Sequence, residues 1–351
     1  MTSRVVLVGL GRISTVHLRA LEDIDSVTTV VGVDPGPKVI PSFRREPLCV
    51  RADLGDALVA GADLVVVATP TASHAAVVGA VRAWDEDVPI LLEKPAADRR
   101  DDADRVLSAT PAVEVIFHTA FGPEVLWATG FCASETSRLG DVVAFKAWFG
   151  GPYAHDLENR TESLANSWLD SGINALSVIG RFVLPSAVTS FRSLADHAST
   201  FEARLRLGTP DAGRGGTIVT TWQAAEHSQW TRLRFESGAE LVLDHIAGAA
   251  TLFEDGAVAA LYTRADVDPR LEVHYANFYR DYFGARLLQY PEQAGRDLHG
   301  LLFSALKRLD EERMRPGEAT CAPVAPPPTG ATASQRPAAK DPALPSARAA
   351  P

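Results

Sequence analysis

The chain has 351 residues and a formal net charge of -10, and 46% of its residues are hydrophobic and 22% charged. This balance is typical of globular proteins, and the length suffices for two domains, so the composition excludes a disordered chain or a single small module. The negative charge argues against a nucleic-acid partner, because such partners are bound through clustered Lys and Arg.

The cysteines and the apolar runs indicate the cellular compartment of the protein. Cys49, Cys132 and Cys321 lie far apart, which indicates neither a disulfide framework nor a metal site and favours a reducing environment. Residues 1–4 lack the features of a secretory leader, and apolar runs such as 64–68 are far too short to span a membrane. We therefore expect a cytoplasmic protein without a membrane partner or a metal.

The first third of the chain alternates short aliphatic runs with helix-like segments. The predicted strands are 5–8, 28–33, 64–69, 90–92 and 113–117. This order is typical of βαβ units, in which helices cover both faces of a parallel sheet. Residues 1–120 are therefore predicted to form a doubly wound α/β domain.

Beyond residue 120 the strand candidates lie closer together and are flanked by Gly, Asp and Ser. Examples are 142–148, 201–207, 217–222, 231–235, 239–243 and 257–262. Such flanks are typical of turns, so residues 121–314 are predicted to form an α+β domain with a largely antiparallel open sheet.

Two helices are predicted to close this domain, over 273–288 and 292–312, the second beginning at Pro291. From Arg315 onward the sequence is rich in Pro and Ala and has no aromatic residue. It cannot bury enough apolar surface to offset the entropy of ordering it, so 315–351 is predicted to be a disordered tail.

A glycine-rich turn follows the first predicted strand, where Gly9-Leu10-Gly11 leads into a helix. Glycine permits a tight turn and close approach of a phosphate, and the amino end of the helix attracts its negative charge. Ser14 replaces the third glycine of the usual dinucleotide motif, so an ordinary strand–turn–helix is the alternative. The predicted cofactor contacts here are Gly9, Gly11, Arg12 and Ile13.

Asp34 ends the second predicted strand, near the spacing of about 20 residues at which a carboxylate binds the ribose hydroxyls. The same carboxylate would repel a 2′-phosphate, which favours NAD, whereas nearby Lys38 keeps NADP possible. The alternative role for Asp34 is to form the turn before Pro35-Gly36.

Three further segments follow in order: Ala68-Thr69-Pro70-Thr71-Ala72-Ser73-His74, then Glu93-Lys94-Pro95, then Asp170-Ser171-Gly172-Ile173-Asn174. Together with the glycine-rich turn and His17, they make residues 4–312 resemble the Gfo/Idh/MocA oxidoreductases. The resemblance implies a Rossmann domain that binds NAD, with NADP possible. It adds five predicted cofactor contacts, Thr69, Pro70, His74, Glu93 and Lys94.

The resemblance also implies hydride transfer between nicotinamide and a carbon that bears a hydroxyl, usually on a sugar or other polyol. The protein then has to orient the substrate and handle a proton. Lys94, predicted to lie at a strand end by the nicotinamide, could accept the proton as an amine or stabilise an alkoxide as an ammonium. An ordinary surface lysine is the alternative.

Asn174 departs from the family pattern Asp-x-Gly-x-His, whose histidine is thought to be the acid/base. An amide cannot relay a proton at neutral pH. In a helix, Asp170 and Asn174 would project from one face and meet the same hydroxyl. We expect Asp170, alone or with Lys94, to take the proton while Asn174 orients the hydroxyl. The alternatives are a helix cap for Asp170 and a satisfied structural amide for Asn174.

The Asp-x-Gly-Ile-Asn form resembles the branch of the family that oxidises aldoses such as L-arabinose or D-galactose at C1, which implies an aldonolactone product. The C1 hydroxyl is more acidic than an ordinary alcohol, so a weaker base suffices. Other possible functions are a keto-sugar or cyclitol oxidoreductase of a biosynthetic pathway and a non-catalytic regulator that binds NAD or a sugar. The resemblance further implies a homodimer or homotetramer.

Two histidines are further candidates for contact with the substrate. His118 follows the last strand of the first domain, near the domain junction, and His155 lies with Asp156 and Glu158 on a polar loop. Each could instead be structural. Trp168, close to Asp170, is predicted to fill the core.

Overall fold

The computed structural model describes residues 3–37, 40–108, 113–195, 198–264, 269–284, 286 and 292–313. Lys38, Pro291 and the predicted tail 315–351 lie outside the described residues. Within these ranges, no helix is long and apolar enough to cross a membrane.

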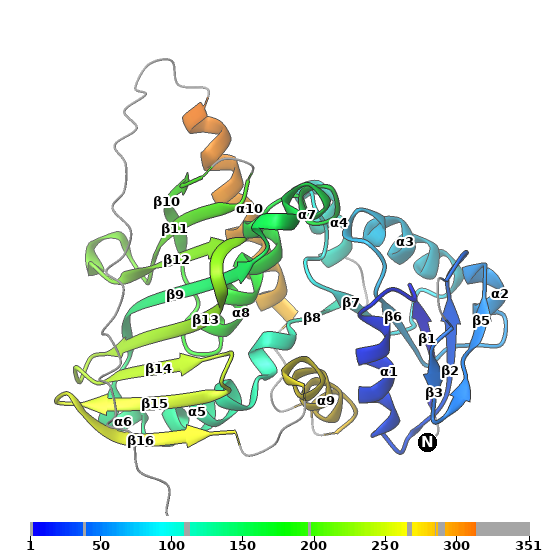
Figure 1. Ribbon diagram of the computed structural model, residues 1–351, viewed down its shortest axis with the longest axis horizontal. Coiled ribbons are helices and arrows are strands. Elements are labelled where there is room, and N and C mark those ends of the chain that lie inside the picture. The colour runs from blue at the N-terminus through cyan, green and yellow to red at the C-terminus, as the bar shows by residue number, and fades with distance from the viewer. Residues whose placement is uncertain are drawn as a thin grey trace, which may run out of the picture. The chain divides into compact units, whose positions relative to one another are not determined.

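The first sheet contains six parallel strands in the order β5-β2-β1-β6-β7-β8 (Figure 1). Their bounds are β1 Ser3–Val8, β2 Val27–Val33, β5 Cys49–Arg51, β6 Leu64–Val67, β7 Ile90–Glu93 and β8 Val113–Ile116. Val and Leu fill β6 and most of β1, and these strands are buried because helices cover both faces. The predicted parallel sheet is confirmed.

Helices and short turns connect these strands. They are α1 Ser14–Glu22, α2 Leu54–Leu58, η1 Thr71–Ser73, α3 His74–Trp84, α4 Arg100–Leu107 and η2 His118–Phe121, with a small ribbon of β3 Ser42–Phe43 and β4 Glu46–Pro47. The strand order reverses between β1 and β6, and ligands of such sheets bind beyond the carboxyl ends of the strands at this reversal.

The second sheet has eight strands in the order β10-β11-β12-β9-β13-β14-β15-β16. Neighbours are antiparallel except β12 and β9, which run parallel. The bounds are β9 Val142–Pro152, β10 Ala187–Ser193, β11 Thr200–Arg206, β12 Gly215–Thr221, β13 Gln223–Phe235, β14 Glu240–Asp244, β15 Ala249–Glu254 and β16 Ala257–Thr263. The largely antiparallel sheet is as predicted.

The remaining helices pack on this sheet or return to the first one. They are α5 Pro123–Ser134, α6 Thr136–Leu139, η3 Ala154–Asp156, α7 Leu157–Leu164, η4 Trp168–Gly172, α8 Ile173–Gly180, η5 Pro210–Ala212, α9 Arg270–Phe283 and α10 Glu292–Arg313. Helix α9 packs against α1, and α10 packs against α4, α8 and β10 (Figure 1). The last helices of the chain therefore bring side chains to the carboxyl edge of the first sheet.

Candidate functional site

The glycine-rich turn is shaped by close contact with the end of β6. Gly9 has a φ of +95°, and a Cβ on it would lie 2.7 Å from the main-chain oxygen of Ala68, so no other residue fits without strain. A Cβ on Gly11 would meet no atom within 4 Å, so the turn is open there. Ser14, in place of the third glycine, is buried and its Oγ donates to the Gly11 carbonyl (2.6 Å).

Asp34 lies beside this turn. Its Oδ2 accepts a hydrogen bond from the Leu10 amide (3.0 Å), and its Oδ1 accepts one from the Gly36 amide (2.9 Å). The second bond is the turn-forming role that was the alternative for Asp34. An ionised carboxylate has about four acceptor positions, so two remain for ribose hydroxyls. The open turn and this carboxylate fit a dinucleotide.

His74 joins two loops at the carboxyl ends of β6 and β7. Its Nε2 lies 2.9 Å from the Thr69 carbonyl oxygen, and its Nδ1 lies 3.1 Å from that of Pro95. Burial lowers the pKa of His74, although the carbonyls and Glu93 oppose this shift. Thr69 Oγ1 is buried and has no hydrogen-bond partner in the described part of the chain, which suits a polar ligand beside it.

Glu93 ends β7 inside a buried polar network. The Tyr275 hydroxyl donates to its Oε1, and His17 Nε2 lies 3.2 Å from the same oxygen, while His17 Nδ1 is 2.7 Å from the Tyr279 hydroxyl. Burial alone raises the pKa of Glu93, but the hydrogen bond and charge of His17, with contributions from Tyr275 and Lys94, lower it overall. Glu93 is therefore held as an anion next to Lys94.

Lys94 and Asp170 form an ion pair in the crevice. Lys94 Nζ donates to the Asp170 main-chain oxygen (2.8 Å) and to Oδ1 (3.2 Å), and the two side chains are 13% and 18% exposed. Asp170 Oδ2 accepts from the indole of Trp222 (3.1 Å), and Arg160 Nη1 lies 3.7 Å away. Neither η4 nor α8 has a side-chain cap, so Asp170 is not the helix cap considered as an alternative.

The Asp170 segment is a turn of π-helix, η4, where an ordinary helix was predicted. Such turns are frequently found at functional sites. Asn174 follows in α8, and its Nδ2 donates to the Asp170 main-chain oxygen (3.4 Å) rather than to the carboxylate. Its buried Oδ1 has no partner among the described residues, so the alternative of a satisfied structural amide does not hold for this oxygen.

A pocket of about 130 Å³ lies between the loops of the first sheet and the Asp170 segment. Its lining includes Pro70, Pro95, Asp98, Leu169 and Asp170. The structure thus brings the Ala-Thr-Pro and Glu-Lys-Pro segments and the Asp170 motif to one crevice.

His118 begins η2, shortly after the last strand of the first sheet. Its ring stacks on Tyr275 (5.2 Å between centroids) and on His274 (5.8 Å). Burial, followed by the charges of His274, Lys94 and Arg270, lowers the pKa of His118 well below its usual value, so the imidazole is neutral at neutral pH.

Two other sequence candidates lie elsewhere. His155 is exposed on η3 and lines a separate pocket with Asp156 and Glu158, and no contact joins His155 to Lys94 or Asp170. Trp168 is fully buried and its indole donates to the Leu302 carbonyl (3.0 Å), which confirms its predicted place in the core.

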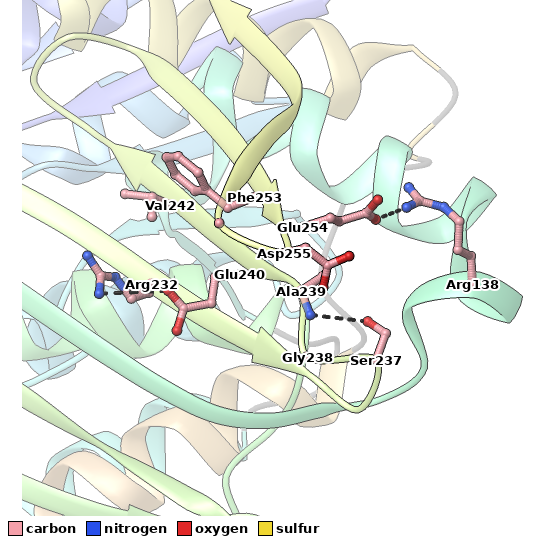
Figure 2. Close-up of a pocket in the computed structure, with 11 residues that line it drawn as sticks. Arg138, Arg232, Ser237, Gly238, Ala239, Glu240, Val242, Phe253, Glu254 and Asp255 are labelled. Atoms are coloured by element: carbon pink, nitrogen blue, oxygen red, sulfur yellow. Dashed lines mark hydrogen bonds and ion pairs between the residues drawn. The ribbon is translucent and has the colours of Figure 1, made fainter.

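A larger pocket, of about 650 Å³, lies away from the predicted site residues, at the turns of the second sheet (Figure 2). Its charged side chains pair with one another: Arg138 with Glu254, and Arg232 with Glu240 (3.8 Å). Among the described residues, no group of His, Cys, Asp or Glu is arranged to hold a metal ion.

The contact partners of the predicted residues do not follow from the sequence; they are Arg160, Trp222, His274, Tyr275 and Tyr279. In α9, His274, Tyr275, Phe278 and Tyr279 recur at helical spacing and are buried. That stripe indicates a packed helix face. It does not indicate that this face meets Glu93 and His17, which follows only from the return of α9 to the first sheet.

Residues 3–121 match the model of the Gfo/Idh/MocA oxidoreductase family, described as an NAD-binding Rossmann fold. The rhizopine catabolism protein MocA of Rhizobium meliloti is 27% identical over 215 residues, which are 60% of this chain and 65% of that protein.

Solved structures share the fold over most of the chain. A myo-inositol dehydrogenase from Corynebacterium glutamicum has a TM-score of 0.67 at 17% identity, covering 90% of this chain and 100% of its own. A levoglucosan dehydrogenase in complex with NADH and levoglucosan has a TM-score of 0.71 at 13% identity, covering 88% and 98%. The Rossmann sheet, the glycine-rich turn and the family match agree. Residues 3–121 are thus similar to the NAD-binding Rossmann domain of the Gfo/Idh/MocA oxidoreductases.

Proposed function

We propose that this protein is an NAD-dependent dehydrogenase that oxidises a hydroxyl of a sugar or other polyol, with C1 of an aldose as the first candidate. The Lys94–Asp170 pair carries the proposal, because it places a cation and a carboxylate at the carboxyl end of β7. Two proteins that share the fold are named as dehydrogenases of myo-inositol and levoglucosan, both of which are polyhydroxy compounds.

NAD, when bound, supplies the acceptor for the hydride that leaves the carbon. Lys94 has three N–H donors, of which two point to Asp170, so the third is left for the substrate oxygen. As an ammonium paired with a carboxylate, Lys94 stabilises negative charge on that oxygen while the O–H bond breaks. The proton passes to a carboxylate oxygen of Asp170, and the carbon–oxygen double bond forms.

Asn174 would orient the hydroxyl through Oδ1, whose hydrogen-bonding capacity is unused among the described residues. An aldose suits this arrangement because its C1 hydroxyl is more acidic than an ordinary alcohol. Asp170, which already accepts from Lys94 and Trp222, then suffices as the proton acceptor without the histidine that Asn174 replaces.

A dehydrogenase screen tests the proposal. The purified protein is incubated with NAD or NADP and a panel of aldoses, inositols and other cyclitols, and NADH or NADPH absorbance is followed. We expect NADH formation with at least one aldose and loss of that rate in Lys94→Met. Absence of turnover across the panel, together with tight NAD binding in calorimetry, would contradict it and favour a regulator. Consumption of NADH with a keto-sugar nucleotide alone would favour a biosynthetic reductase.

A further inference from the structure

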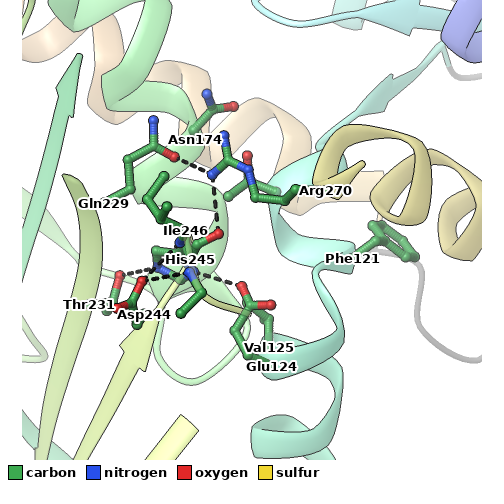
Figure 3. A network of polar contacts seen from close by, with 12 residues as sticks. Phe121, Glu124, Val125, Asn174, Gln229, Thr231, Asp244, His245, Ile246 and Arg270 are labelled. Atoms are coloured by element: carbon green, nitrogen blue, oxygen red, sulfur yellow. Dashed lines mark hydrogen bonds and ion pairs between the residues drawn. The ribbon is translucent and has the colours of Figure 1, made fainter. Parts of the chain in front are cut away.

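Arg270 is a half-buried cation whose counter-ion is absent from the described residues. It is the first residue of α9, and its Nη1 donates to Gln229 Oε1 (2.7 Å) and to the His245 carbonyl oxygen (3.2 Å) (Figure 3). Both acceptors are neutral. Its Nε and Nη2 make no hydrogen bond with the described residues, so two parallel donor groups are left over.

The place of this guanidinium is electrostatically unfavourable without an anion. A cation at the amino end of a helix opposes the helix dipole, and burial lowers the pKa of Arg270. The nearby carboxylates form no ion pair with Arg270, although Glu124 Oε2 is buried without a hydrogen-bond partner among the described residues. Glu124 Oε1 is 2.8 Å from His245 Nδ1, and Asp244 Oδ1 accepts from the amides of Ile246 and Ala247 (both 2.9 Å).

Arg270 lies one turn before His274 on α9, and the ring of His274 stacks on that of His118 (5.8 Å between centroids). The charges of Arg270 and Lys94 both lower the pKa of His118. Arg270 and Arg160 likewise both lower the pKa of His227, and Arg160 lies beside Asp170.

Unused hydrogen-bonding groups gather in the same region. His274 is 1% exposed, and neither ring nitrogen has a hydrogen-bond partner among the described residues. Asn174 Oδ1, drawn with the Arg270 network in Figure 3, is also without one. Buried polar groups are normally paired, so these atoms and the two free donors of Arg270 together indicate a polar, anionic ligand.

We propose that Arg270 binds a carboxylate of the substrate, so that the compound oxidised at Lys94 and Asp170 is an acidic sugar or polyhydroxy acid such as a uronate. The inference rests on the proposed dehydrogenase function. Two parallel N–H groups match the two oxygens of a carboxylate. A phosphate monoester could accept the same pair of hydrogen bonds, but its second negative charge requires more than one guanidinium group.

Matched substrate pairs test the inference. We would measure kcat/KM with NAD for D-galacturonate against D-galactose and for D-glucuronate against D-glucose, with glucose 6-phosphate as the phosphate arm. Hydrogen bonds to charged groups contribute about 1.5–3 kcal/mol, so the acid should be preferred by roughly 10- to 100-fold. Arg270→Gln should abolish this preference by lowering kcat/KM for the acid about 10- to 100-fold more than for the neutral sugar. Arg280→Gln, which changes an exposed arginine of the same helix, is the control and should change neither.

Equal use of acid and neutral sugar by the parent protein, or equal loss of both in Arg270→Gln, would overturn the inference while leaving the dehydrogenase intact. Preference for the 6-phosphate would overturn the choice of a carboxylate. If no sugar is turned over, the proposed function fails. Calorimetric titration of D-galacturonate into the protein–NADH mixture then tests the carboxylate site on its own. Binding that disappears in Arg270→Gln supports the site, and absence of binding overturns it.

Discussion

Lys94 Nζ contacts both the main-chain oxygen and the carboxylate of Asp170, at 2.8 and 3.2 Å, across 76 positions of sequence. The carboxylate is held from its other side by Trp222. The ammonium group is therefore fixed between the end of β7 and the π-helical turn, and its third donor has one free direction.

Replacing Lys94 by Met should remove the charge that stabilises the developing alkoxide and leave the hydrophobic stem. We expect kcat to fall by roughly 100- to 10,000-fold, the range for loss of a group positioned for proton or charge handling. NAD affinity, measured by calorimetry, should change little. Lys307→Met, at an exposed lysine of α10, is the matched control and should behave as the parent protein. A fully active Lys94→Met would exclude the proposed role.

Asn174→Leu separates function from stability. The buried Oδ1 is unpaired among the described residues, so replacing the amide by an apolar group of similar size should leave the thermal midpoint unchanged or raise it. The same change should lower kcat/KM by about tenfold, because an orienting hydrogen bond to the substrate contributes about 1 kcal/mol or more.

Asn166→Leu is the matched control for this experiment. Asn166 Oδ1 accepts from the Leu169 amide (2.8 Å), so this variant should be destabilised by about 1 kcal/mol. A lower thermal midpoint in Asn174→Leu, with unchanged kinetics, would mean that Asn174 is structural.

Asp34→Asn should change cofactor choice. It removes the negative charge that would repel a 2′-phosphate and keeps one acceptor for the Leu10 or Gly36 amide. We expect KM for NAD to rise by roughly 10-fold and the NAD-to-NADP preference to shrink, because hydrogen bonds to charged groups contribute about 1.5–3 kcal/mol. Asp53→Asn is the control, since Asp53 accepts from the Gly55 and Asp56 amides as a helix cap. An unchanged preference in Asp34→Asn would argue against a ribose contact.

The sequence predicted those parts of the fold that depend on local patterns. The aliphatic runs of β1 and β6 are continuous and β2 is rich in β-branched residues, and the three predicted strands agree with the structure to within two residues. β5, with three residues, and β10, which mixes polar and apolar residues, were missed because neither has a clear periodicity.

The candidate site likewise has some residues that the sequence predicts and others that only the folded structure brings in. Lys94 and Asp170 belong to short motifs that can be read from the sequence. Trp222, between β12 and β13, contacts Asp170, and Tyr275 of α9 contacts Glu93, and only the packing of those elements brings them there. The π-helical turn was also unpredictable, because its sequence fits an ordinary helix.

The loop that carries Lys94 is held by a histidine that couples folding to pH. His299, on α10, accepts a hydrogen bond from the Ala96 amide through Nε2 (2.9 Å), and its Nδ1 lies 2.7 Å from the Gly295 carbonyl oxygen. The imidazole is therefore neutral, with its proton on Nδ1. Burial lowers the pKa of His299 from 6.5 to about 4. Ala96 follows Lys94 by two residues, so this bond helps to hold the catalytic loop.

His299 makes the protein less stable in acid because the unfolded chain takes up a proton that the folded protein does not. Below pH 6.5 the unfolded chain protonates this histidine while the folded protein does not, so the contribution of His299 is complete above pH 6.5 and is lost as the pH falls toward 4. A shift of this size corresponds to about 3 kcal/mol. Urea unfolding between pH 4 and 8 should show a shallower loss of stability in His299→Gln than in the parent protein.

Part of the slope should persist in His299→Gln, because His118 and His274 also have lowered pKa values. His155→Gln, at an exposed position, is the control and should keep the full slope. Identical slopes in the parent protein and His299→Gln would show that His299 does not couple folding to pH. If the slopes differ, kcat of the parent protein should also fall below pH 5, since protonated His299 can no longer accept from the Ala96 amide.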